Sequence, residues 1–478
     1  MKLKAPIRDS VTTINQDGSR YFVHPADVRG FWTLYRRCAG LGLIAIYILL
    51  PIVKVNGAPA VFLDIFHQRL HLFGLNFMFQ DLWLLFFLIT GLGFTLFFVT
   101  SLFGRLWCGW ACPQTVFLDH VFRRVERFID GDATSRRRLA DAPLAAGKIL
   151  RRVIKHGIYI ALCAGIAHLF LSYFVSIPEL YRMTHLSPLE NRGSFLFVMA
   201  LSGVLYFNFA WFREQFCIIM CPYGRLGSVL IDDNSIVVGY DAKRGEPRGK
   251  TASPKGQCGN CSSCEKCRSV EIMGDCIDCR RCVQVCPTGI DIRQGLQLEC
   301  ISCESCIDAC NEIMGKLGRP KGLIRHDSLN ALSGKKTRFL RPRLFIYLAL
   351  MIAGAAAFGV AMQKVKPVVV SALRMQGAPY FKEGNRIRNN FMLRLANKQA
   401  EERTYTISIA SPVPALEVAG GNNQKVKIAA TGEIQEPLIL TLPLAEFPGQ
   451  FDVQIQILGE NGKIENERTV PFLGPFRK

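Results

Sequence analysis

The chain has 478 residues, half of them apolar, and its 58 Lys and Arg outnumber its 38 Asp and Glu by 20. This combination excludes a single soluble globule and is typical of an integral membrane protein whose basic cytoplasmic loops attract anionic lipid. Nucleic acid is the weaker explanation of the charge, and we expect no such partner. Of the 18 cysteines, 12 lie between Cys258 and Cys310. Such clustering favours metal ligands over the scattered disulfides of a secreted fold.

Five segments are apolar and long enough to be considered as spans of a hydrocarbon core roughly 30 Å thick. They are Cys38 to Val55, Leu82 to Gly104, Gly157 to Ile177, Ser194 to Phe212 and Leu344 to Met362. The first has the least secure boundary, because Lys54 and Pro51 lie near its outer end. The sequence therefore predicts a five-helix transmembrane bundle, and no apolar region that could act as a cleavable signal peptide precedes Cys38.

Lys and Arg alternate between rich and poor connections. Residues 1–37 carry seven, 105–155 carry eleven and 213–343 carry twenty-one, whereas 56–81 and 178–193 carry one and two. The positive-inside rule then predicts a bacterial inner-membrane protein with a cytoplasmic N-terminus and a periplasmic C-terminus. The predicted parts are a cytoplasmic segment 1–37, four spans within 38–212 with the basic loop 105–155, a cytoplasmic ferredoxin-like domain 213–343, a fifth span 344–362 and a periplasmic domain 367–478.

Two external regions differ in character. Residues 367–478 show short alternating runs separated by Pro, Gly and Asn, which predicts an all-β, immunoglobulin-like sandwich that docks or stabilises. Its expected strands include Arg403 to Ala410, Lys425 to Ala429, Pro437 to Leu442 and Phe451 to Leu458. The segment Gly57 to Asp81 holds His67 and His71 at helical spacing. Interfacial packing is favoured there over a quinone or metal site.

The strongest chemical signal is a pair of cysteine runs, each C-x2-C-x2-C-x3-C. This spacing lets one loop present three soft thiolates to an iron-sulfur cube, and in two-cluster ferredoxins the fourth cysteine binds the other cluster. Zinc ribbons and disulfides fit less well. The expected 4Fe-4S ligands are Cys276, Cys279, Cys282 and Cys310 for cluster 1, and Cys300, Cys303, Cys306 and Cys286 for cluster 2. Pro287 follows the first run, but Asn311 stands at the equivalent place in the second.

A further quartet precedes these runs in a stretch rich in Gly, Ser, Asn, Glu and Lys. Packing does not explain thiols at strict three-residue steps in such a polar segment. A third cluster, a mononuclear zinc or copper site, and a redox-active thiol cluster all remain open. The quartet is Cys258, Cys261, Cys264 and Cys267.

Two C-x3-C-P motifs follow the second and fourth spans. Cysteines four apart would share one face of a helix, and the proline would disturb the helix directly after them. If the spans pack together, the four thiols converge at the cytoplasmic surface, where they would favour Cu(I), with Met220 as a further soft ligand. These cysteines are Cys108, Cys112, Cys217 and Cys221. Cys38 and Cys163 are expected to pack only, and His168 needs a polar partner inside its span.

Several of these motifs together resemble one family. CGWACPQTVF (108–117), CPYGRL (221–226), RGEPRG (244–249), CIDCRRCVQVCPTGIDIR (276–293), LECISCESCIDAC (298–310) and GRPKGLIRHDSL (318–329) are similar to the cytochrome c oxidase accessory proteins called CcoG, FixG or RdxA. The resemblance covers essentially the whole chain. It implies an inner-membrane polyferredoxin that reduces Cu(II) to Cu(I) during assembly of a cbb3-type haem-copper oxidase, with oxidase assembly proteins as partners. The Cys258 to Cys267 quartet is not part of that pattern.

Three functions are therefore weighed. The first is a cupric reductase, an oxidoreductase that uses 4Fe-4S clusters. The second is a quinol-oxidising electron-transfer module, as in related membrane polyferredoxins with the same C-P motifs. The third is a non-catalytic metal-binding scaffold or redox sensor. No GxGxxG fingerprint follows a predicted strand, so we expect the electron donor to be a separate protein or molecule.

Overall fold

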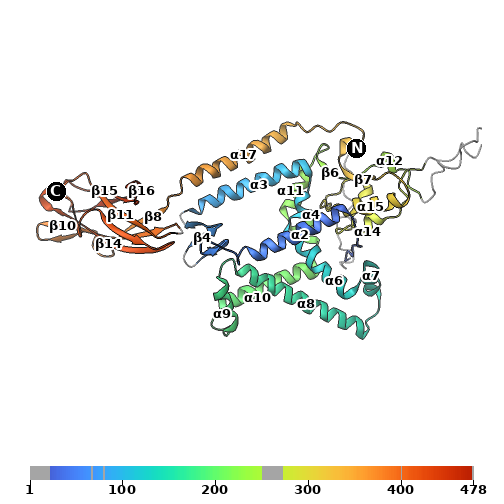
Figure 1. Cartoon of the computed structure of the whole chain (residues 1–478), viewed down its shortest axis with the longest axis horizontal. Coiled ribbons are helices and arrows are strands. Elements are labelled where there is room, and N and C mark those ends of the chain that lie inside the picture. Colours follow the sequence, from blue (N-terminus) through green and yellow to red (C-terminus); the bar gives the residue numbers. More distant parts are fainter. Residues whose placement is uncertain (1–21, 66–67, 79–80, 250–272, 400, 476–478) are drawn as a thin grey trace, which may run out of the picture. The chain divides into compact units, whose positions relative to one another are not determined.

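The computed structural model describes residues 22–65, 68–78, 81–249, 273–399 and 401–475. The chain divides into two compact units, whose elements are labelled in Figure 1. Unit 1 combines Met1–Leu49, Leu88–Leu171 and Tyr181–Ala356, and unit 2 combines Leu50–Phe87, Ser172–Leu180 and Ala357–Lys478. The segments rich in Lys and Arg thus fall in unit 1, while unit 2 contains the basic-poor connection 56–81 and the C-terminal region.

Four helices in the described part of the chain are long and apolar enough to cross a membrane. They are α3 (Trp83–Phe103), α8 (Ala146–Leu171), α10 with its π-helical continuation (Arg192–Phe212) and α17 (Pro342–Gln363). Three agree closely with the predicted spans. The helix α8 begins eleven residues before the expected Gly157 and ends at Leu171, six residues before Ile177. Its first turns therefore belong to what was expected to be the basic loop.

The first predicted span differs most from the structure. Helix α2 runs from Phe31 to Leu49, so it begins seven residues before Cys38, and Lys54–Val55 form a short strand, β1. It is not among the four span candidates. The helix continues through Arg36 because that side chain has partners elsewhere: its Nε donates to the Gly109 carbonyl at 2.7 Å. A basic residue was therefore a poor marker of the helix boundary.

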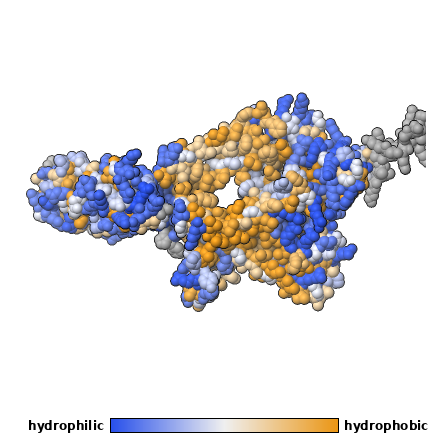
Figure 2. Space-filling model, in the orientation of Figure 1, coloured by the Kyte–Doolittle hydropathy of each residue, from blue (hydrophilic) through white to orange (hydrophobic). Residues whose placement is uncertain are grey.

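The apolar faces of the long helices are largely uncovered, as expected for lipid contact. On α3, Phe86, Ile89 and Leu92 expose more than half of their surface. Figure 2 shows hydrophobic residues gathered over the helical part of the chain. Within unit 1, α3 and α17 approach closely at Gly91 and Gly354, where a Cβ on Gly354 would lie 3.1 Å from the Gly91 Cα. Small residues allow this approach, as in other membrane helix pairs.

Short elements connect the long helices of unit 1. The cytoplasm-expected connection after α3 contains α4 (Leu106–Trp110), α5 (Pro113–Phe117), the π-helix η2 (Leu118–Phe122), α6 (Arg123–Asp130) and α7 (Ala133–Asp141). Phe122 stacks on Phe209 with ring centroids 4.3 Å apart, and Cys163 is buried in the same cluster. This aromatic core fixes η2 against α8 and η3 (Phe207–Phe212).

The cysteine-rich insert is a small domain with a two-stranded sheet. Strand β6 (Ile236–Tyr240) pairs antiparallel with β7 (Ile324–Ser328), and the cysteine runs lie between them in sequence. Its core includes Val238, Ile292 and Met314. The helices between Phe216 and Leu332 are η4 (Phe216–Met220), α11 (Pro222–Leu230), α12 (Ala242–Gly245), α14 (Arg281–Gln284), η5 (Ile292–Gln294), α15 (Ser305–Lys316) and α16 (Leu329–Leu332).

The C-terminal region of unit 2 is a two-sheet β domain. One sheet has the order β12-β14-β10-β8 with β9 on β10, and the other has the order β13-β11-β15-β16. Inward residues such as Leu395, Tyr405 and Ile455 form its apolar core. The strands are β8 (Val368–Arg374), β9 (Phe381–Glu383), β10 (Arg386–Asn397), β11 (Arg403–Ala410), β12 (Glu417–Val418), β13 (Gln424–Ile428), β14 (Glu433–Pro443), β15 (Phe451–Leu458) and β16 (Ile464–Phe472). The β-rich prediction is therefore confirmed, with two strands matching at both ends.

The interpretation of the His67 and His71 spacing as helical was wrong. His71 lies in strand β4, hydrogen-bonded through its ring to Asn76, while His67 lies outside the described residues. Strands β3 (Val61–Asp64), β4 (Arg69–Leu72) and β5 (Leu75–Met78) form an antiparallel sheet. Two short strands, β1 and β2 (Ala58–Pro59), precede it. After β5, Asp81 accepts a hydrogen bond from Lys398 of the β domain at 2.6 Å, and both side chains are buried.

Candidate metal centres

The two cysteine runs adopt the same backbone conformation. Asp278 and Arg280 have φ of 52° and 54°, and their counterparts in the second run, Ser302 and Glu304, have 51° and 64°. The left-handed conformation costs non-glycine residues about 1–2 kcal/mol each. Its repetition at equivalent positions indicates that both loops curl in the same way around a centre.

A helix begins one residue before the third cysteine of each run, so that Cys282 lies in α14 and Cys306 in α15. Pro287 follows Cys286, and α14 ends at Gln284, because proline cannot continue a helix. Asn311 allows α15 to continue to Lys316, and its side-chain oxygen accepts the Gly322 N–H at 2.9 Å. The absence of a proline after Cys310 therefore lengthens α15 and leaves the spacing of the four cysteines unchanged.

The eight cysteines surround two small cavities, in crossed sets. The first cavity is lined by Cys276, Cys279, Cys282 and Cys310. The second is lined by Cys286, Cys300, Cys303 and Cys306, and Cys282 also reaches it. The fourth cysteine of each run thus lies at the cavity of the other run, so the structure brings together the two predicted ligand sets.

The donor atoms at both cavities fit a polynuclear metal centre. All fourteen cysteines within the described ranges are free thiols. Burial raises the pKa of Cys282 and of Cys300 to about 12, so both would need metal cations beside them to ionise. Four thiols around a shared space, three of them from one C-x2-C-x2-C run, suit an iron-sulfur cube better than a single zinc ion.

Each cavity has a buried arginine beside it that acts on one of its cysteines. Arg293 pairs with Asp291 at 2.7 Å and with Asp278 of the first loop, and its charge lowers the pKa of Cys282 against the larger effect of burial. Arg36 acts in the same way on Cys303 of the second cavity. Sequence reasoning missed both residues. The alternation of Asp291 and Arg293 was a local signal for the first, but Arg36 is 267 positions from Cys303 and gave none.

The C-x3-C-P motifs are not single helices, contrary to the sequence interpretation. Cys108 lies in α4, but Cys112 is the extended N-cap residue of α5. Cys217 lies in the π-helix η4, and Cys221 is the extended N-cap residue of α11. The helix breaks at the second cysteine because the following proline is accommodated best in the first turn of a new helix. The Gln114 and Thr115 N–H groups donate to the Cys112 sulfur as a result.

The first of these motifs packs directly on the second cysteine loop. Cys108 forms a buried apolar cluster with Ile301 and Cys303. A Cβ on Gly109 would lie 2.4 Å from the Ile301 carbonyl oxygen and 3.1 Å from the Cys303 backbone nitrogen. Glycine is therefore required for the backbones of the two motifs to touch.

The four motif thiols are close enough to repel one another when ionised. Burial raises the pKa of Cys217 to about 12, with further upward contributions from Cys112, Cys108 and Cys221. Arg105 opposes this effect at Cys217 and, with a hydrogen bond, at Cys108. Met220 is 63 % exposed, which does not support its predicted role as an additional ligand.

The remaining candidates are less informative. Cys38 is exposed, whereas Cys163 is fully buried. His168 bonds through Nδ1 to the Ala164 carbonyl at 2.8 Å, one turn earlier in its own helix. Exposure of Cys38 does not fit its expected packing role. The quartet Cys258, Cys261, Cys264 and Cys267 lies outside the described residues.

Curated proteins match most of this chain. "Nitrogen fixation protein FixG" of Rhizobium meliloti is 33 % identical over 474 residues, covering 89 % of this chain and 87 % of FixG. "Protein RdxA" of Cereibacter sphaeroides is 34 % identical over 426 residues, covering 85 % of this chain and 86 % of RdxA. The chain belongs to the FixG/RdxA family. The resemblance inferred from the motifs is thus confirmed.

Domain families match three parts of this FixG/RdxA protein. Residues 212–329 match "4Fe-4S dicluster domain", 82–130 match "4Fe-4S binding domain", and 358–475 match "IG-like fold at C-terminal of FixG, putative oxidoreductase". A crystal structure of a FixG-related protein from Vibrio parahaemolyticus is 14 % identical, covers 23 % of this chain and 100 % of its own, and has a TM-score of 0.21. This family member is a membrane-linked iron-sulfur electron-transfer protein with a C-terminal immunoglobulin-like domain.

Proposed function

We propose that the two crossed cysteine sets hold two 4Fe-4S clusters and that this protein reduces Cu(II) to Cu(I) for assembly of a cbb3-type cytochrome c oxidase. The observation that carries the proposal is the packing of Cys108 on Ile301 and Cys303, which joins the second cavity to the C-x3-C-P thiols. When bound, 4Fe-4S clusters supply single electrons. Each Cu(II) accepts one electron and becomes Cu(I).

The side chains support an ordered path from solvent to copper. Cys279 of the first cavity is exposed, which suits contact with a separate electron donor. Cys282 lines both cavities and so separates them by little more than one side chain. Cys303 of the second cavity is buried against Cys108. The donor would therefore act at the first cavity, and copper would bind beyond the second.

The four C-x3-C-P thiols have the chemistry to hold copper as substrate. Thiolates favour Cu(I), so reduction would strengthen binding at Cys108, Cys112, Cys217 and Cys221. Arg105 lies beside Cys108 and favours its thiolate form, although burial opposes ionisation more strongly. Loss of the thiol proton would accompany metal binding.

Charge and packing support a multi-pass arrangement in the bacterial inner membrane. Unit 1 contains the basic segments, and unit 2 contains the basic-poor connection 56–81 together with the C-terminal domain. The positive-inside rule would place the cysteine domain in the cytoplasm and the immunoglobulin-like domain in the periplasm. Oxidase subunits or assembly proteins would then be partners, with copper delivered from the cytoplasmic side.

One observation favours a second assignment for the C-x3-C-P thiols. The match of residues 82–130 to a 4Fe-4S binding family includes Cys108 and Cys112. Under this assignment the four thiols hold a third cluster instead of copper, and the protein is an electron carrier with a different acceptor. Iron bound per chain, compared before and after Cys108→Ala and Cys112→Ala, separates the two assignments.

The proposal is tested by an anaerobic Cu(II) reduction assay on purified, cluster-replete protein. The protein is reduced with dithionite, excess reductant is removed, and Cu(II) is added while EPR follows copper and iron-sulfur signals together. We expect the EPR signal to fall by the equivalent of one Cu(II) ion for each cluster that is oxidised. The Cys108→Ala/Cys112→Ala variant should keep its iron and fail to reduce copper. Cluster oxidation without loss of the Cu(II) signal, or full reduction by the variant, would contradict the proposal.

A further inference from the structure

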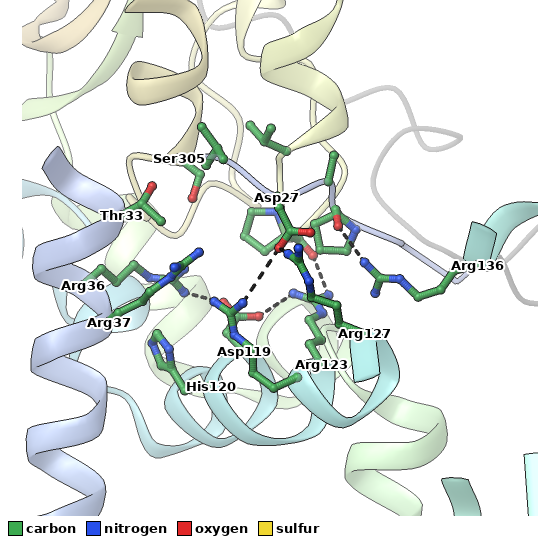
Figure 3. A pocket seen from close by; sticks show the side chains of 16 residues that line it. Asp27, Thr33, Arg36, Arg37, Asp119, His120, Arg123, Arg127, Arg136 and Ser305 are labelled. Atoms are coloured by element: carbon green, nitrogen blue, oxygen red, sulfur yellow. Dashed lines mark hydrogen bonds and ion pairs between the residues drawn. The ribbon is translucent and has the colours of Figure 1, made fainter. Parts of the chain in front are cut away.

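A deep basic cavity lies beside the second cysteine cavity, entirely within unit 1. Its volume is about 90 Å³, and its walls come from the extended segment after Phe22, α2, η2, α6 and α7 (Figure 3). Val285, Pro287 and Ser305 complete the wall, and these residues adjoin Cys286 and Cys306. Six arginines line it: Arg36, Arg37, Arg123, Arg124, Arg127 and Arg136.

The acidic residues around this arginine cavity are already engaged. Asp119 pairs with both Arg36 and Arg123, and Asp27 pairs with Arg127 and, at 3.8 Å, with Arg124. Two buried glutamates behind the wall, Glu126 and Glu214, are shared among Arg123, Arg136 and Arg213. Seven guanidinium groups in this network therefore face four carboxylates.

The excess charge is concentrated at Arg37 and Arg124. In the described part of the chain, the buried Nε of Arg37 has no hydrogen-bond partner and no carboxylate pairs with its guanidinium. Burial and the nearby Arg37 charge lower the pKa of Arg124. His120 on the same wall has its pKa lowered to about 4, chiefly by burial, so it is neutral near pH 7 and does not compensate for or add to the charge. A partly buried cation without a carboxylate partner, such as Arg37, is costly, and a bound anion would offset that cost.

We propose that this cavity binds a phosphate group, supplied either by free phosphate or by the headgroup of an anionic lipid. Guanidinium groups present paired N–H donors that match phosphate oxygens. Three uncompensated positive charges suit a phosphate with one or two negative charges, and Ser305 adds a hydroxyl to the wall, whereas the Thr33 hydroxyl already donates to Asp308 at 2.7 Å. A cavity of about 90 Å³ has room for a single phosphate group but not for a folded protein segment.

The location gives the bound group a second effect, which rests on the proposed clusters. A negative charge beside Pro287 and Ser305 would lie one residue from Cys286 and Cys306. It would disfavour adding an electron to the second cluster and so lower its reduction potential. Phosphate binding would thereby change the driving force for electron transfer from the second cluster to copper.

Binding is tested first, with full-length protein in detergent and inorganic phosphate as the probe in calorimetry. We expect saturable binding to one site, weakened at least tenfold in Arg37→Gln/Arg124→Gln and largely restored in Arg37→Lys/Arg124→Lys. The matched control is Arg137→Gln/Arg138→Gln, which removes the same charge from the exposed face of α7 and should bind as the parent protein does. Unchanged iron content in each variant verifies folding.

A parallel arm uses nanodiscs of phosphatidylcholine with or without phosphatidic acid, and phosphate-free buffer. Competition between phosphatidic acid and inorganic phosphate assigns the lipid as a source, whereas phosphate binding without competition assigns the free anion. Absence of binding in both arms, or equal weakening in the pocket and control variants, overturns the proposal. A redox titration with and without phosphate then reports the cluster effect separately, so normal binding with no potential shift would refute only the coupling.

Discussion

The two cysteine cavities have the same loop geometry but different surroundings. The first has an exposed ligand candidate, Cys279, and its arginine, Arg293, comes from the same small domain. The second is closed by Cys108 and Gly109 of the membrane-proximal motif, and its arginine, Arg36, comes from α2. Similar loops in unequal environments would give the proposed electron path a direction. The first site is open to a donor, and the second is joined to the rest of the chain.

The largest expected effect is loss of copper reduction when the second cavity is broken. Cys303→Ser should remove the second cluster, because a serine oxygen is a harder and poorer ligand for iron. Copper reduction should then fall at least a hundredfold, whereas Cys279→Ser should remove the first cluster and slow the reaction less with dithionite as donor. Rapid-mixing EPR measures both. Equal rates of copper reduction in the two variants would contradict the different roles assigned to the two clusters.

Copper reduction should be nearly as sensitive to changes at the contact between the first C-x3-C-P motif and the second cysteine loop. Gly109→Ala places a methyl group 2.4 Å from a backbone oxygen, so the loops must move apart. We expect destabilisation of about 1–3 kcal/mol and at least tenfold slower copper reduction with both clusters retained. The control is Gly42→Ala, because a Cβ there meets nothing within 4 Å. Thermal unfolding and single-turnover reduction measure the two effects, and parent-like transfer in Gly109→Ala would count against the path.

The buried arginines offer a finer comparison of the two sites. Arg293→Gln should lower the reduction potential of the first cluster, because it removes a positive charge beside Cys282, and should leave the second nearly unchanged. Arg36→Gln should do the reverse. Potentiometric EPR titration resolves the two potentials, with each variant serving as the control for the other. A parallel shift of both potentials in either variant would show that the sites do not have separate electrostatic environments.

Unit 2 should be separable from the cavities of unit 1. Lys398→Met leaves Asp81 as a buried, unpaired carboxylate, which should destabilise unit 2 by about 3–5 kcal/mol. Iron content should not change, since all eight cluster cysteines lie in unit 1. Asp81→Asn with Lys398→Met should recover part of the loss. Deletion of residues 367–478 is a stronger test, and loss of iron after that deletion would contradict the expected independence of the β domain from the cysteine-rich insert.

The smallest expected effect concerns the Cys258 to Cys267 quartet. Replacing all four cysteines by serine should leave copper reduction within about twofold of the parent if the C-x3-C-P thiols bind the copper that is reduced. Copper titration and the EPR assay test this directly. Loss of copper binding in the quartet variant, with full binding retained after removal of the membrane-proximal cysteines, would transfer the copper site to the quartet.

The sequence predicted what depends on local spacing. The C-x2-C-x2-C pattern predicted two similar loops, and the alternation of apolar and polar residues predicted strands such as Arg403–Ala410. It could not reveal long-range partners: the start of α2 was misplaced because Arg36 gave no sign of its contacts with Gly109 and Asp119. The break at Cys112 was missed because helical spacing alone does not specify an N-cap. The arginine cavity was missed because its six arginines come from three separate helices, α2, α6 and α7.

Iron counting in paired variants tests the central claim, that each centre takes its fourth cysteine from the other run. Cys276→Ser/Cys310→Ser should retain one intact cluster, as each single variant does, because both changes fall on one site. Cys276→Ser/Cys286→Ser should lose both clusters and nearly all iron. Iron and acid-labile sulfide per chain, with Mössbauer spectra, measure the outcome. If Cys276→Ser/Cys286→Ser retains one cluster and Cys276→Ser/Cys310→Ser retains none, the ligands are not crossed and the account is contradicted.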